Sequence, residues 1–179
     1  MGKGSRQMKK IVLTLAALVF VGVAGGMGLL NATFQPDDLS EQDYQISLEE
    51  AISIFEEEAH SQKVTSIGFF LPDEVKKTAS SAYSYLFVDK EHEVVVNPTT
   101  GKTTTKAISQ QKKQNQTQLE TKKLRKAKKP QVAMKEAIAV SGNKRAKVHA
   151  WEILEKEGKL YYNIHLLAEK KIQQFLISA

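Results

Sequence analysis

Three patterns of hydrophobic and polar positions follow one another along the chain, and the first is a long apolar run. Residues 11–30 contain no charged side chain, and 20 such residues are about what an α-helix needs to cross a membrane. The ten residues before them carry four basic side chains and no acid. This predicts a cytoplasmic segment 1–10, a membrane anchor 11–30 and an extracellular remainder. A signal sequence that is cleaved to give a secreted protein is the alternative.

A helical period follows a polar spacer, residues 31–43. Ser47 and Glu50 have the spacing of a capping box, in which each side chain binds the other residue's backbone N–H. Apolar residues then recur at i, i+3, i+4 and i+7, which predicts one buried helical stripe: Leu48, Ala51, Ile52 and Phe55. This helix is expected to end near His60.

A strand period replaces the helical one after residue 64. Segments 64–71, 83–88 and 93–96 read as strands, and 103–108 as a short fourth. In the second segment Tyr83, Tyr85 and Phe87 alternate with smaller residues, so they are expected to pack in the core. One helix followed by an antiparallel meander is an α+β unit.

The same order of elements recurs near the C-terminus. Residues 133–139 share Glu-Ala-Ile with residues 47–53 at the same place, and segments 146–154, 160–167 and 172–177 read as strands. The chain is therefore predicted to be α+β, with a transmembrane helix followed by two small units, each one helix on its own antiparallel sheet. The units are residues 44–108 and a shortened copy, 131–179, with 109–130 as linker.

The first unit resembles the PepSY domain family. The likeness rests on Leu-Glu-Glu-Ala-Ile at 48–52, the aromatic strand, and the valine-rich strand with Thr-Thr-Gly-Lys at 94–102. It is weaker over residues 131–179, which lack the Thr-Gly-Lys turn. The resemblance implies a non-catalytic module, found in the propeptides of thermolysin-like metallopeptidases and thought to restrain peptidase activity. Two such units behind one membrane helix are similar to small surface proteins of Gram-positive bacteria.

The composition limits which catalytic and metal-binding sites the chain can contain. The chain has no cysteine, which excludes disulfides, thiolate metal sites and a cysteine nucleophile and fits an exported Gram-positive protein. The histidines are His60, His92, His149 and His165, and no known catalytic motif surrounds them. His149 and His165 could meet on adjacent strands around a metal ion, but structural roles are favoured. The glutamates at 56–58 suit a solvated helix face better than a calcium site. We therefore expect no enzyme activity, no cofactor and no metal.

Charge is segregated along the chain. Residues 36–101 carry 14 acids and 4 bases, whereas residues 102–130 carry 10 bases and one acid. The basic linker supplies the candidate contacts for anionic lipid or wall polymer: Lys112, Lys113, Lys122, Lys123, Arg125, Lys126, Lys128 and Lys129. A flexible linker without a dedicated partner is the alternative, and so is pairing with the acidic first unit. Nucleic acid is not expected outside the membrane.

These observations predict a non-catalytic, membrane-anchored binding or regulatory module of the cell envelope. Its partner is expected to be an envelope protein, for instance a peptidase. The alternative is a structural or assembly protein of the envelope that docks to anionic polymer or lipid through the basic linker.

Overall fold

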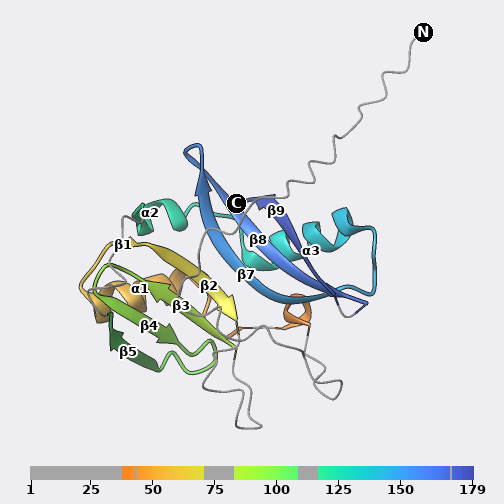
Figure 1. Ribbon diagram of the computed structural model, residues 1–179. Coiled ribbons are helices and arrows are strands. Elements are labelled where there is room, and N and C mark those ends of the chain that lie inside the picture. The colour runs from red at the N-terminus through yellow and green to blue at the C-terminus, as the bar shows by residue number, and fades with distance from the viewer. Residues whose placement is uncertain (1–37, 43, 71–82, 109–116, 170) are drawn as a thin grey trace. The chain divides into compact units, whose positions relative to one another are not determined.

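Seven antiparallel strands lie side by side in the order β5-β4-β3-β2-β7-β8-β9. The computed structural model describes residues 38–42, 44–70, 83–108, 117–169 and 171–179 (Figure 1). The strands of this sheet are β2 (Ser66–Phe70), β3 (Ser84–Val88), β4 (His92–Val96), β5 (Thr103–Ala107), β7 (Lys147–Lys156), β8 (Lys159–Ala168) and β9 (Lys171–Ser178). A second sheet pairs β1 (Lys63–Val64) with β6 (Leu119–Glu120). The helices are η1 (Leu39–Glu41), α1 (Leu48–Ala59), α2 (Thr121–Leu124) and α3 (Pro130–Ser141).

Helix α1 begins and ends where the sequence predicts. The capping box is present, because Ser47 N–H donates to Glu50 Oε2 at 2.7 Å and Glu50 N–H donates to Ser47 Oγ at 3.2 Å. The helix ends at His60, whose left-handed backbone (φ 49°, ψ 37°) closes it. All four residues of the predicted apolar stripe are buried.

The predicted strands are found, but the predicted fold class is wrong. We expected α+β architecture with two units, each on its own sheet. The described residues are instead mostly β. Strand β2 pairs with β7, so the strands of both predicted units form one seven-stranded antiparallel sheet. The physical reason is that an edge strand leaves a row of backbone N–H and C=O groups without partners. Joining the edges at β2 and β7 satisfies both rows.

No helix in the described part of the chain is long and apolar enough to span a membrane. The predicted membrane segment, residues 11–30, lies outside the described residues. The transmembrane helix expected there therefore has no counterpart in the fold described above.

Helices α1 and α3 cover the same face of the sheet. Phe55 of α1 stacks on Phe87 of β3, with ring centroids 5.0 Å apart. At the other half, Tyr162 of β8 donates its hydroxyl to the carbonyl of Lys128, just before α3, at 2.7 Å. Burial raises the pKa of Tyr162 well above its ordinary value. The aromatic residues predicted for the core lie there.

The chain enters the fold through residues 38–46, part of which was expected to be a spacer. Leu39 of η1 is fully buried in the shared core. Asp38 accepts a hydrogen bond from the backbone N–H of Val148 in β7 at 3.1 Å. A few residues later, Ile46 N–H donates to the carbonyl of Pro98 at 2.8 Å, in the turn between β4 and β5. This segment therefore binds both halves of the sheet.

Candidate functional site

The basic segment predicted as the contact site is anchored to the fold by a few buried residues, whereas five of its six described basic side chains are exposed. Lys112 and Lys113 lie outside the described residues, whereas the other six basic residues belong to α2 and the chain that leads to α3. Leu119 and Leu124 of this segment are 7% and 1% exposed. The hydroxyl of Thr121 donates to Glu56 Oε1 of α1 at 2.6 Å. Apolar burial and a buried hydroxyl hold the segment to the first half.

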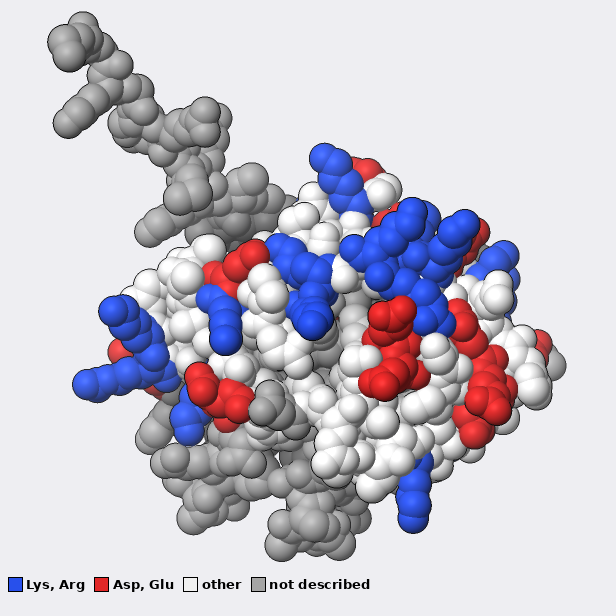
Figure 2. Space-filling model, turned by 180° about the vertical axis from the view of Figure 1, so that it is seen from behind, with Lys and Arg blue, Asp and Glu red and all other residues white. Residues whose placement is uncertain are grey.

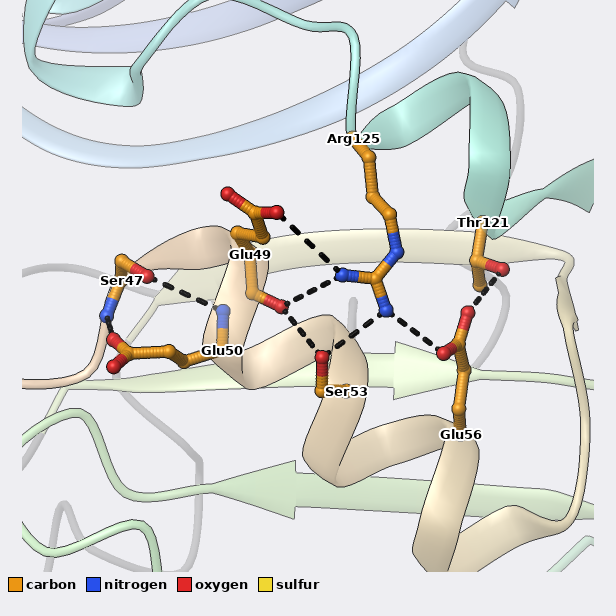
Figure 3. A network of polar contacts seen from close by, with 7 residues as sticks. All are labelled: Ser47, Glu49, Glu50, Ser53, Glu56, Thr121 and Arg125. Atoms are coloured by element: carbon orange, nitrogen blue, oxygen red, sulfur yellow. Dashed lines mark hydrogen bonds and ion pairs between the residues drawn. The ribbon is translucent and has the colours of Figure 1, made fainter.

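Arg125 lies at the centre of a network that joins this segment to α1 (Figure 3). Its Nη2 atom donates to Glu56 Oε2 at 2.8 Å and to Ser53 Oγ at 3.1 Å. Its Nη1 atom donates to the backbone carbonyl of Glu49 at 3.4 Å. One guanidinium therefore contacts three residues on successive turns of the acidic helix, as the forked donors of arginine allow.

Two lysines of the segment have acidic partners in the second half. Lys123 Nζ lies 2.7 Å from Glu155 Oε1 of β7, and this hydrogen bond raises the pKa of Lys123 above its ordinary value. Lys128 Nζ lies 2.9 Å from Glu136 Oε2 of α3. With Arg125 included, three of the six described basic side chains of the segment therefore form ion pairs with acids of the same chain.

Three lysines of the segment are left for other contacts. Lys122, Lys126 and Lys129 are exposed, and no ion pair of theirs is found among the described residues. Figure 2 shows a dense group of Lys and Arg side chains on one face, bordered by Asp and Glu. The predicted contact site is thus divided into side chains that hold the fold and side chains that face solvent.

A polar cluster that the sequence analysis did not single out lies on the sheet face opposite the helices. Asn163 Nδ2 donates to Glu152 Oε1 at 2.7 Å and lies 3.2 Å from His165 Nε2. The side chains of Glu152 and His165 are 13% and 18% exposed. A neutral imidazole accepts the amide hydrogen bond through Nε2. Asn163 and His165 are neighbours on one face of β8, and the pairing of β7 with β8 brings Glu152 to them, so no local signal in the sequence marks the cluster.

The described residues offer no metal site. No group of three or more His, Asp or Glu side chains among them is placed to hold a metal ion. His165 contacts Glu152 and Asn163, and His149 lies at the register shift between Val148 and Ala150 in β7. Glu56, from the acidic cluster of α1, binds Arg125 and Thr121. Glu152 and Asn163 thus connect β7 with β8, and Glu56 connects α1 with the segment that contains α2.

One hollow lies at the end of α1. It has a volume of about 200 Å³ and is lined by Ala59, His60, Ser61, Asp89, Lys90, Glu91 and Gln118. Asp89 uses Oδ1 to accept the backbone N–H groups of Glu91 and His92, which fixes the turn between β3 and β4. The carboxylate of Asp89 thus forms hydrogen bonds within the turn. The hollow itself is polar and shallow.

Comparison with known proteins adds a likeness of fold. No family model and no curated protein sequence matches the chain. A crystal structure of a protein described as a "putative lipoprotein", from Clostridium difficile 630, superposes with a TM-score of 0.57 at 16% sequence identity. The match covers 79% of this chain and 91% of that one. At this identity the likeness shows a shared fold alone, and the resemblance to the PepSY family stays a prediction.

Proposed function

We propose that the chain is a non-catalytic binding protein of the cell envelope, held at the outer face of the membrane by residues 11–30. The observation that carries the proposal is the likeness of fold to the Clostridium protein, which is described as a lipoprotein and is covered over 91% of its length. The uncharged run at 11–30 supplies the anchor, and the basic residues before it set the orientation.

A regulatory role without catalysis agrees with how the polar groups are used. Arg125, Glu56 and Thr121 join α2 to α1, and Glu152 and Asn163 join β7 to β8. Each of these side chains has a partner within the fold. The resemblance of residues 44–108 to PepSY domains makes a peptidase the partner to test first.

An extended peptide segment of such a partner fits the edge of the sheet at β5. β5 is an outer strand of the seven, and four of its five residues are exposed. Asn97 N–H donates to Lys102 O, and Ile108 N–H donates to Glu91 O. Because hydrogen-bonded pairs alternate along an antiparallel ladder, the N–H of Thr105 is directed away from β4. Backbone groups placed in this way accept an added strand.

Location is tested first, by membrane fractionation and protease treatment of intact cells. The proposal predicts that the full chain sediments with membranes and is digested from outside. Recovery of the chain in the cytosol, protected from protease, would overturn it.

Binding is tested with the full chain and secreted peptidases of the same organism. The wild-type chain is expected to inhibit at micromolar concentration, and Thr105→Pro is expected to lose inhibition because proline removes the outward N–H. Thr105→Val, which keeps that N–H, is the matched control. Absence of inhibition and of binding by the wild-type chain would remove the peptidase from the proposal. A truncation that removes residues 131–179 is unsuitable as a control, since it would remove Trp151 and Tyr162 and expose Phe69 and Tyr85, which pack against Trp151.

A further inference from the structure

The two halves of the sheet correspond in how a tyrosine joins strand and helix. Tyr85 of β3 donates its hydroxyl to the carbonyl of Ile46, two residues before α1, as Tyr162 of β8 does to the carbonyl two residues before α3. The cross-strand partner of Tyr85 is Val96 in β4. That of Tyr162 is Ile177 in β9. Strand β9 therefore has the place in the second half that β4 has in the first.

The outer edge of β9 presents backbone groups like those with which β4 binds β5. Ala179 N–H donates to the carbonyl of Leu160 in β8 at 2.9 Å, and hydrogen-bonded pairs alternate along an antiparallel ladder. The N–H and C=O groups of alternate residues, from Ile172 to Ser178, are therefore directed away from β8. The corresponding edge of β4 pairs with β5. In the described part of the chain no strand lies on this side of β9.

Strand β9 lacks the features that usually protect an outer strand from pairing. Residues 172–178 contain no charged side chain and no proline. By contrast, β5, the other outer strand, is shorter and contains Lys106. In β9 Gln174 is exposed, and Leu176 is 44% exposed. A long, uncharged outer strand with exposed apolar side chains is suited to pairing with another strand.

The residues of β9 are complementary to a second copy of themselves. When two copies run antiparallel with Gln174 opposite Gln174, Ile172 of each copy lies opposite Leu176 of the other. The two amides can each donate and accept a hydrogen bond, and the two other pairs join apolar side chains. Lys171 lies opposite Ile177, so no like charges face each other. The backbone groups directed outward are those that this register pairs.

We propose that β9 pairs with β9 of a second copy of the chain, so that two seven-stranded sheets join into one. Such a contact uses the same residues on both copies and closes after two of them, whereas pairing of β9 with β5 of another copy would continue into an open assembly. The dimer leaves the outer edge of β5 open to the peptide segment proposed above. It depends neither on the membrane anchor nor on the peptidase.

The first test is disulfide formation between single cysteines, because the chain contains no cysteine of its own. In the proposed register the Cα atoms of the two copies of residue 174 lie about 5.5 Å apart, which suits a disulfide. Gln174→Cys in the full chain is expected to give a covalent dimer on mild oxidation. Ser178→Cys is the matched control. It lies on the same face of the same strand, but about 27 Å from its counterpart, and should cross-link at least about tenfold less.

The second test measures dimerisation without a cross-link, by analytical ultracentrifugation over a series of concentrations. Gln174→Pro removes the outward N–H at the centre of the pairing and leaves the bonds to β8 in place. It is expected to raise the dissociation constant of the dimer at least about tenfold, because both hydrogen bonds of the central pair are lost. Gln174→Ala keeps this N–H and should stay within about threefold of wild type. Unchanged unfolding temperatures verify that both variants are folded.

Two results would overturn the proposal. A wild-type chain that stays monomeric at every concentration would leave the edge of β9 to a strand of another protein. Equal cross-linking of Gln174→Cys and Ser178→Cys would show an association without this register, such as one through the apolar run at 11–30. A dimer that cross-links at residue 174 alone and is weakened by Gln174→Pro is the result expected.

Discussion

Phe69 of β2 and Trp151 of β7 face each other across the junction between the two halves of the sheet. The residues are cross-strand partners, and their rings stack with centroids 5.7 Å apart and planes 9° apart. Tyr85 and Tyr162 contact the indole edge to face, at 6.1 and 5.5 Å. Trp151 is 1% exposed. The largest side chain of the core thus lies where the two halves meet, and it belongs to both.

Trp151→Ala should therefore destabilise the whole fold. Truncation of a buried aromatic residue costs about 3–5 kcal/mol through lost apolar contact and the cavity left behind. We expect the free energy of unfolding to fall by that amount, measured by urea denaturation. The wild-type chain should unfold in one transition seen equally by fluorescence and circular dichroism. Two separate transitions would contradict a shared core. Leu176→Ala in β9 is the control, because Leu176 is 44% exposed.

A side chain at Gly68 should destabilise the fold, because β2 and β7 approach closely there. A Cβ atom at this position would lie 3.1 Å from the backbone oxygen of Trp151 and 3.2 Å from the ring of Phe70. We expect Gly68→Ala to lower the free energy of unfolding by about 1–3 kcal/mol. Ser66→Ala, on the same strand and face, should change it by less than about 0.5 kcal/mol. Equal stability of Gly68→Ala and wild type would show that the strands can separate without cost.

Arg125 and Glu56 should be energetically coupled. Their side chains are 29% and 24% exposed and lie 2.8 Å apart, so solvent screens the pair only partly. A double-mutant cycle of Arg125→Ala and Glu56→Ala is expected to give a coupling energy of about 1 kcal/mol that decreases in high salt. The cycle of Lys126→Ala and Glu57→Ala should give a value near zero. A zero result for the first cycle would mean that the Arg125–Glu56 pair contributes nothing beyond the other contacts of α2 with α1, such as the hydrogen bond of Thr121.

Glu50 should make the stability of the fold sensitive to acid. Hydrogen bonds from the backbone and side chain of Ser47 lower the pKa of Glu50 below its ordinary value of 4.5. A lowered pKa in the folded state gives stability that is complete above the unfolded pKa and is lost as pH falls through the folded one. The unfolding temperature of wild type is therefore expected to drop more than that of Glu50→Gln below pH 4.5. Parallel curves for the two proteins, with Glu57→Gln as control, would contradict this cause.

The locally encoded elements are those that the sequence predicts well. The capping box at Ser47, the stripe containing Phe55 and the alternation around Tyr85 each need only neighbouring residues, and the structure confirms them. The fold class was wrong because it depends on a pairing between residues such as Ile67 and Ile153, which are remote in sequence. No periodicity of one strand shows which other strand lies beside it.

For the candidate contact site, too, the sequence shows some features and the tertiary structure decides the others. The sequence identifies Lys122, Arg125 and their neighbours as a basic segment, because charge can be counted along a chain. Which of them face solvent was decided by tertiary contacts: Arg125 binds α1, and Lys122 binds no acid among the described residues. The cluster of Glu152, Asn163 and His165 exists only through the register of β7 with β8.

The sequence by itself determined the bounds of α1 and the approximate positions of the main strands, since these depend on capping, turns and periodicity within a few residues. The tertiary structure decided that one sheet serves both halves, since β2 and β7, which would be edge strands in two separate sheets, pair with each other. It also decided which charges remain free, since an ion pair depends on distances between residues that the fold alone brings together.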